Sequence, residues 1–175
     1  MEIREQRPHD LEALLAFYAS IPEDERTFLK EELLDRKTIE SWLQDTHSRR
    51  GLACERDGVV GVVGVVPLLG WSDHVGEVRL VVAPDHRRSG VGRSLARWAL
   101  VAAVEAGLQK LIVEVVAEQE GAVAMFQSLG FRAEAMLRDH IRARDGQTRD
   151  LILLAHPVAE QWEAMVTIGF EDDLA

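Results

Sequence analysis

The residues best suited to chemistry lie between positions 85 and 97, where arginines and glycines gather. This stretch holds four arginines and one acid, a local charge of +3 in a chain whose formal net charge is −10. Within it, the segment Arg87-Arg88-Ser89-Gly90-Val91-Gly92 separates an apolar run from a run with helical spacing. The first N–H groups of a helix lack acceptors, and its dipole is positive there. Because glycine also lets the backbone approach a ligand closely, the pattern predicts a phosphate or other anion site.

Two common phosphate-binding turns do not fit this segment. A nucleotide P-loop ends in Gly-Lys-Ser/Thr, which is absent here. A dinucleotide-binding turn needs a third glycine, where this chain has Leu95. The pattern that does match is Arg/Gln-x-x-Gly-x-Gly/Ala, with Arg87, Gly90 and Gly92 at its fixed positions.

This turn and its surroundings resemble the GCN5-related N-acetyltransferase (GNAT) superfamily. A strand pattern covers residues 77–84 before the turn, and another covers residues 111–116 after the helix. Residues 121–131 then form a short helical pattern that closes on Leu-Gly-Phe. The resemblance implies an acetyl-CoA-dependent N-acetyltransferase that acts on a primary amine by direct attack on the thioester. The alternatives are a non-catalytic acyl-CoA-binding sensor or partner module and a transferase that uses another acyl-CoA.

The resemblance also implies where the cofactor lies. The strand before the turn splays from the next strand, and the pantetheine arm lies in the gap and pairs with backbone groups of Val81 and Val82. The backbone from Arg87 to Ser94 holds the pyrophosphate, and Gln119 stands where relatives often place an asparagine that contacts the pantetheine. The implied cofactor-binding residues are Val81, Val82, Arg87, Arg88, Ser89, Gly90, Val91, Gly92, Arg93, Ser94 and Gln119.

Catalysis by this route needs a base that removes a proton from the amine. Glu77, at the start of the splayed strand, stands where several family members place a catalytic glutamate; the other reading is a strand-end acid paired with Arg79. His74 and Asp73, in the preceding loop, are further candidates, or ordinary polar loop residues. Many relatives carry a tyrosine that protonates the leaving thiolate, and Phe126 occupies the matching position. The sequence therefore leaves the proton donor unassigned.

The sequence indicates the acceptor only through the charge and aromatic content of the regions that would surround it. Six acids and two bases lie between residues 23 and 35, and the loop before the 77–84 strand holds Trp71, Asp73 and His74. Acidic and aromatic side chains suit a cationic amine, which suggests a small amine or a protein N-terminus or lysine. A solvated acidic helix explains the same residues without any ligand.

The elements that must position these residues alternate between strand and helix patterns along the chain. We expect an α/β (α+β) fold, a single N-acetyltransferase domain over residues 1–175 with a mixed central sheet of about six to seven strands and helices on both faces. Its core would span residues 58–156. N-terminal helices over residues 8–47 would cover the acceptor side, and a C-terminal helix would follow over residues 158–168.

Composition narrows the class of protein further. The only cysteine is Cys54, so an intramolecular disulfide is excluded, which fits a reducing compartment. No signal-peptide pattern and no membrane-spanning apolar run occurs, so we expect a cytoplasmic protein with no membrane partner. The net negative charge argues against nucleic-acid binding. The six histidines show no paired metal spacing, so no metal is expected. The sequence leaves open whether the chain forms a homodimer.

Overall fold

The computed structural model describes residues 1–26, 29–30, 33–56 and 58–158 of the 175-residue chain. Its strands are β1 (Glu2–Glu5), β2 (Arg49–Glu55), β3 (Gly58–Pro67), β4 (Val75–Val82), β5 (Lys110–Val116), β6 (Arg132–Arg142) and β7 (Thr148–Pro157). Its α-helices are α1 (Leu11–Ser20), α2 (Glu23–Arg26), α3 (Arg36–Gln44), α4 (Val91–Glu105) and α5 (Glu120–Ser128). Three 3-10 turns are η1 (Pro8–Asp10), η2 (Gly70–Ser72) and η3 (Pro84–His86).

All seven strands form one sheet in the order β1-β2-β3-β4-β5-β7-β6. Neighbouring strands are antiparallel except for β4 and β5, which are parallel and joined through α4. This mixed sheet confirms the fold class and the strand number expected from the sequence.

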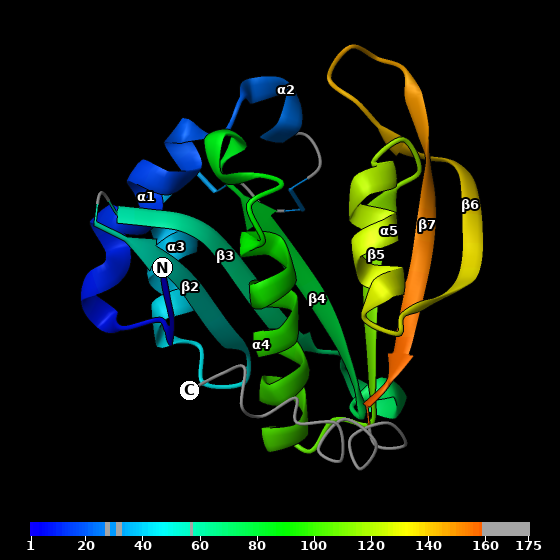
Figure 1. Ribbon diagram of the computed structural model, residues 1–175, viewed down its shortest axis with the longest axis horizontal. Coiled ribbons are helices and arrows are strands. Elements are labelled where there is room, and N and C mark those ends of the chain that lie inside the picture. The colour runs from blue at the N-terminus through cyan, green and yellow to red at the C-terminus, as the bar shows by residue number, and fades with distance from the viewer. Residues whose placement is uncertain (27–28, 31–32, 57, 159–175) are drawn as a thin grey trace.

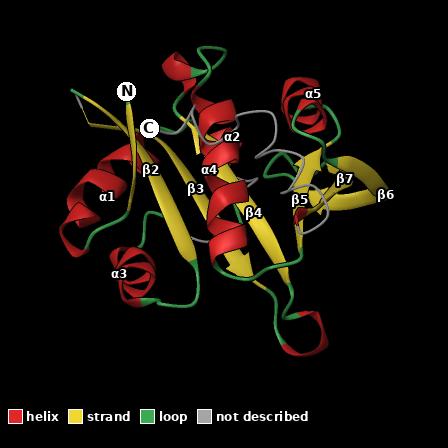
Figure 2. Ribbon diagram, turned by 60° about the horizontal axis from the view of Figure 1, so that its bottom comes forward, coloured by secondary structure: helices red, strands yellow, loops and turns green. Residues whose placement is uncertain are grey.

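Helices cover both faces of the sheet because its central strands are apolar on both sides. On β3, Val62 packs with residues of α1 and α3, whereas its neighbour Val63 packs with residues of α4 and α5. Successive side chains of a strand point to opposite faces, so one valine-rich strand serves two cores. Figure 2 shows α1 and α3 on one side of the sheet and α4 on the other.

The parallel pair β4–β5 separates partway along its length. The two strands pair only where residues 75–78 face residues 110–113. β4 then continues to Val82 beside β3, and β5 continues to Val116 beside β7. Figure 1 shows the two strands diverging toward the end at which α4 begins. The sheet thus has a gap at its centre, as the family resemblance implied.

Within the described residues, the N-terminal region contains three separate α-helices, of which α3 begins after Asp35. Asp35 caps α3, and its side chain accepts a hydrogen bond from the Lys37 amide at 3.2 Å. The C-terminal helix expected over residues 158–168 lies outside the described residues, except for Val158. None of the helices in the described ranges is long and apolar enough to span a membrane.

Candidate active site

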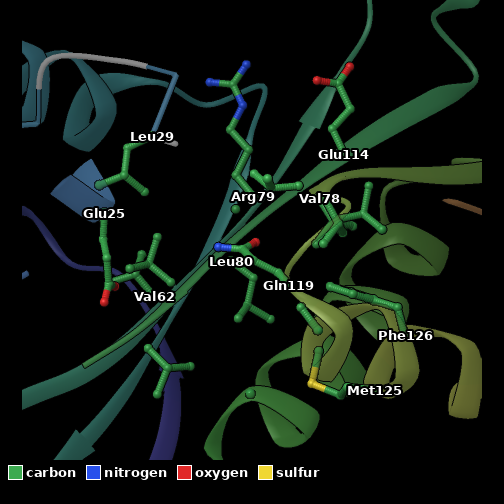
Figure 3. Close-up of a pocket in the computed structure, with 18 of the residues that line it drawn as sticks. Glu25, Leu29, Val62, Val78, Arg79, Leu80, Glu114, Gln119, Met125 and Phe126 are labelled. Carbon is green, nitrogen blue, oxygen red and sulfur yellow. The ribbon is translucent and has the colours of Figure 1, made fainter. Parts of the chain in front are cut away.

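A pocket of about 890 Å³ occupies the gap between β4 and β5 (Figure 3). Its walls come from both splayed strands, the turn before α4, the start of α5 and the region around α2. It therefore brings together segments that are far apart in the sequence. Nine of the residues singled out from the sequence line it: Glu77, Val81, Val82, Arg87, Arg88, Gly90, Gly92, Arg93 and Gln119.

The backbone of β4 offers hydrogen-bonding groups to the gap at alternate residues. Ala83 donates its amide to the Val60 carbonyl at 2.9 Å, so it belongs to a hydrogen-bonded pair with β3. Because such pairs alternate along an antiparallel ladder, Val81 also directs its backbone groups toward β3. Leu80 and Val82 direct theirs toward the gap. Of the two predicted residues, Val82 thus turns its backbone groups toward the gap, as Leu80 does, whereas Val81 lines the pocket with its backbone groups toward β3. The pairing of Val81 and Val82 with a cofactor stays a prediction.

The turn before α4 exposes the start of that helix to the pocket. Gly90 is the N-cap of α4 and has a φ of 94°, a left-handed conformation that favours glycine. The Ser94 amide donates to the Gly90 carbonyl at 3.0 Å, which begins the helical ladder. The amides between these two residues have no acceptors within the helix, and Gly92 lines the pocket. Ser89, Val91 and Ser94 do not line it; Val91 is buried in the core.

Two arginines, one in the turn and one in the first turn of α4, already have partners. Arg87 forms an ion pair with Glu25 of α2 through both of its terminal nitrogens, one of them at 3.0 Å. Its Nε donates to the carbonyl of Val82, at 3.2 Å. Arg93 donates to the Ser128 hydroxyl at 2.6 Å. Hence Arg87 contacts one of the gap-facing carbonyls as well as the acidic helix.

Glu77 is buried, with 7% of its surface exposed, and is held by two cations. Its Oε1 lies 2.5 Å from the Lys30 Nζ and its Oε2 lies 3.2 Å from a terminal nitrogen of Arg79. Burial alone would raise the pKa of Glu77, but the hydrogen bonds from Lys30 and Arg79 outweigh it and leave the pKa below its ordinary value. Glu77 is therefore ionised at neutral pH.

A second carboxylate reaches the same ammonium from the other strand. Glu114 of β5 lies with Oε2 at 2.7 Å from the Lys30 Nζ. Figure 3 shows Glu114 and Arg79 rising from the two splayed strands on the same side. Both Glu114 and Lys30 were missed from sequence. The available signal for Glu114 was one acid in the otherwise apolar run 111–116. Lys30 stood in an acidic run with nothing to single it out.

His74 and Asp73 lie away from this cluster. Neither lines the pocket, and both side chains are exposed. The His74 carbonyl accepts a hydrogen bond from the Gln109 amide at 2.8 Å, beside the paired end of β5. The structure thus brings Glu77 into the pocket and leaves His74 outside it.

The α5 wall carries the remaining candidates. Gln119 is the N-cap of α5, and its backbone N–H donates to the Val116 carbonyl at 2.9 Å. Phe126 lines the pocket but is otherwise buried, with its ring edge-on to Phe131 at 5.1 Å. Tyr18 lines the pocket from α1, although only 2% of its surface is exposed. Across the described residues, no group of three or more metal-ligating side chains comes together.

The acetyltransferase (GNAT) family model matches residues 12–131, more than half of the chain. The chain belongs to the GNAT family. Ribosomal protein bS18-alanine N-acetyltransferase of Escherichia coli is 32% identical over 80 residues, which are 46% of this GNAT chain and 53% of that enzyme. This GNAT protein thus spans about half the length of the curated relatives it matches.

Solved structures agree with the fold over most of the chain. Ribosomal-protein-alanine N-acetyltransferase from Brucella melitensis matches with a TM-score of 0.78 and 24% identity, over 90% of this GNAT protein and 99% of that chain. A Salmonella typhimurium protein solved with its cofactor acetyl-CoA has a TM-score of 0.78 and 18% identity, over 90% of this chain and 94% of that one. At these identities the likeness establishes the fold.

Proposed function

We propose that this GNAT protein transfers the acetyl group of acetyl-CoA to a primary amine. The observation that carries the proposal is the pocket at the β4–β5 gap, where backbone groups that neither neighbouring strand pairs adjoin the glycine turn that opens α4. Family membership supports it. Two parts of the pocket have separate tasks: the donor side (Leu80, Val82 and residues 90–92) and the acceptor side (Glu77, Glu114 and Lys30).

The donor side fits a pantetheine arm that ends in phosphates. Leu80 and Val82 offer backbone groups that no strand uses, as an amide-bearing arm requires. The amides of residues 91–93 and the dipole of α4 favour the pyrophosphate. Arg88 and Arg93 add positive charge at the same place, and Gln119 offers an amide from the opposite wall. Arg87 would add its charge by exchanging Glu25 for a phosphate.

Acetyl-CoA would supply an activated carbonyl, and the chain's residues would prepare the amine. The acceptor side presents two carboxylates, from Glu77 and Glu114, to one ammonium group. We assign the role of base to Glu77, which is ionised at neutral pH and can accept the proton of the amine. Because its pKa is low, this carboxylate is a weak base, and we expect deprotonation of the amine to limit the rate at low pH.

The acceptor that suits this pocket is a cationic amine, either a small molecule or a protein N-terminus or lysine. Its charge would face Glu77 and Glu114, and its apolar part would meet Leu29, Leu33 and Tyr18. The similarity to an enzyme named for acetylating an alanine of a ribosomal protein favours testing protein N-termini first.

Two measurements on the unmodified chain test the proposal. Titration calorimetry with CoA and acetyl-CoA should show one binding site, and a thiol-release assay with pools of amines and N-terminal peptides should show repeated turnover, with more than one CoA released per chain, only in the presence of an acceptor. Failure to bind any CoA ester would refute the proposal. Binding without release for every amine would instead identify an acyl-CoA-binding module.

A further inference from the structure

The acceptor side of the pocket already holds a primary ammonium group, and it belongs to the chain itself. The Lys30 Nζ lies 2.5 Å from Glu77 Oε1 and 2.7 Å from Glu114 Oε2. Its side chain lines the pocket and retains 39% exposure, so it enters from the open side. Lys30 therefore makes the contacts that the proposed function assigns to the acceptor's amine.

The two carboxylates converge because of the splay. Val78, Val113 and Val115 belong to the core beneath α4, so the alternate residues Glu77 and Glu114 emerge on the opposite face. Their strands pair up to residues 78 and 113 and part beyond them. Lys30 bridges the strands beside this point of divergence, next to Arg79 and to the gap that would hold the thioester.

The position of Lys30 is unusual among the amines of this chain. The chain has three lysines, at positions 30, 37 and 110. Lys110 lies at the paired start of β5 and forms an ion pair with Glu134 at 2.7 Å. Lys37 lies in the exposed first turn of α3. Neither lines the pocket.

We infer that Lys30 occupies the acceptor's place in this pocket and is itself acetylated by the chain that carries it when no other amine is bound. The inference rests on the proposed function. In the step, a bond forms between Nζ and the acetyl carbon, the C–S bond of the thioester breaks, and CoA leaves as the thiol. Of the two protons that the ammonium loses, one goes by way of Glu77 to solvent and the other ends on the sulfur.

The reaction is self-limiting and slow at neutral pH. Burial would lower the pKa of the Lys30 ammonium, but hydrogen bonds to Glu114 and Glu77 outweigh it and raise the pKa above its ordinary value. Only a small fraction of Lys30 is then neutral, and the rate should rise about tenfold per pH unit below that pKa. Once acetylated, Lys30 has no charge, and Glu77 and Glu114 become free to receive an external ammonium.

Mass spectrometry tests the covalent step without any knowledge of the natural acceptor. The purified chain is incubated with acetyl-CoA alone, and the expected result is a gain of one acetyl group per chain, at Lys30, at a rate independent of protein concentration. Lys30→Arg should abolish the gain, whereas the matched variant Lys37→Arg should retain it. The inference would be overturned if acetylation spread equally over the three lysines. It would also be overturned if a chain denatured by heat before acetyl-CoA is added became acetylated at the same rate.

A second readout needs no acetyl transfer. After reductive methylation with ¹³C-formaldehyde, the three lysines give separate NMR signals. The Lys30 signal should titrate at lower pH in Glu114→Gln than in the unmodified sequence, while the Lys110 signal stays fixed. Addition of CoA, which carries no acetyl group, should shift the Lys30 signal. A Lys30 signal that neither the substitution nor CoA moves would contradict its place between the carboxylates.

Calorimetry with CoA separates the two proposals. If CoA binds, an added amine is acetylated, and Lys30 stays unmodified in acetyl-CoA up to pH 9, the inference about Lys30 is wrong and the proposed function stands. If CoA does not bind, both fall.

Discussion

The proposed donor side of the pocket offers backbone groups to a ligand, whereas the proposed acceptor side offers charged side chains. Leu80, Val82 and Gly90 contribute N–H and C=O groups fixed by the sheet and by the start of α4. Glu77 and Glu114 contribute carboxylates from two different strands, and both form ion pairs with Lys30 of a third segment. A backbone site can accept few local changes of conformation, but a side-chain site can change specificity by single substitutions. Substitutions that change backbone conformation should therefore impair the donor side most, and substitutions that remove charge should impair the acceptor side most.

Gly90→Glu should have the largest effect. The substitution forces a side chain into a φ of 94° and places a carboxylate at the expected phosphate position. Calorimetry should show CoA affinity reduced at least about 100-fold, roughly 3 kcal/mol. Gly146→Glu is the matched control, since Gly146 also has a positive φ, 82°, but lies in the β6–β7 connection away from the pocket. Equal CoA affinity in both variants would remove the donor side from its assigned place.

Glu77→Gln should damage catalysis while leaving the donor side intact. Loss of the carboxylate should lower kcat/KM for an accepted amine about 10²-fold or more, with CoA affinity unchanged. The pH–rate profile should lose its acidic limb, a change that a merely structural role would not produce. Glu134→Gln, which removes a carboxylate paired with Lys110 outside the pocket, should leave the rate unchanged. A Glu77→Gln profile identical to that of the unmodified chain would exclude Glu77 as the base.

Phe126→Tyr asks whether the α5 wall can supply a proton. Phe126 lines the pocket, so a hydroxyl added to its ring can reach the gap and protonate a leaving thiolate. We expect kcat to rise by less than about tenfold, because the proposed reaction does not depend on this group. Phe131→Tyr is the matched control: it makes the same substitution outside the pocket lining and should give no gain in kcat. A lower kcat for Phe126→Tyr with normal CoA affinity would show that the ring serves packing alone.

His156→Phe should alter the pH dependence of stability and nothing in the pocket. His156 is fully buried beside Phe131, its ring nitrogens have no hydrogen-bond partner among the described residues, and burial lowers its pKa below the ordinary value. The unfolded chain then binds a proton more readily than the folded one, so stability falls as pH drops below 6.5, by up to about 1.4 kcal/mol per unit. Urea denaturation at pH 7.5 and 5.5 should show a smaller loss for His156→Phe. Equal losses would show that another group governs this pH range.

The contrast between the two sides also explains what the sequence could reveal. The turn on the proposed donor side was predictable because a local spacing, Arg87 to Gly92, specifies a turn and a helix start together. The order of strands around it follows from periodicity and hairpin signals. Even there, the choice between Val81 and Leu80 required the register with β3, because strand alternation assigns directions only once a neighbour is known.

The acceptor side depends on contacts between residues far apart in the chain. Lys30 meets Glu77 and Glu114 across separations that no local pattern encodes, so the sequence showed an acidic run and a strand-end acid without the cation between them. His74 was a reasonable candidate by its nearness to Glu77 in sequence. Three residues of extended strand, at about 3.3 Å each, are enough to leave it at the paired end of β4, outside the pocket.

The short paired stretch between β4 and β5 has a consequence for local opening of the sheet. Four residue pairs join the two halves of the sheet there, while β4 and β3 share seven. The pocket therefore lies where two central strands share only four residue pairs, as few as the edge strands β1 and β2 share, and α4 is the element that connects β4 to β5. A ligand bonded to Leu80 and Val82 would act as a missing strand. It would slow amide hydrogen exchange where β4 and β5 diverge. Ligand binding would therefore reduce the flexibility at the centre of the sheet.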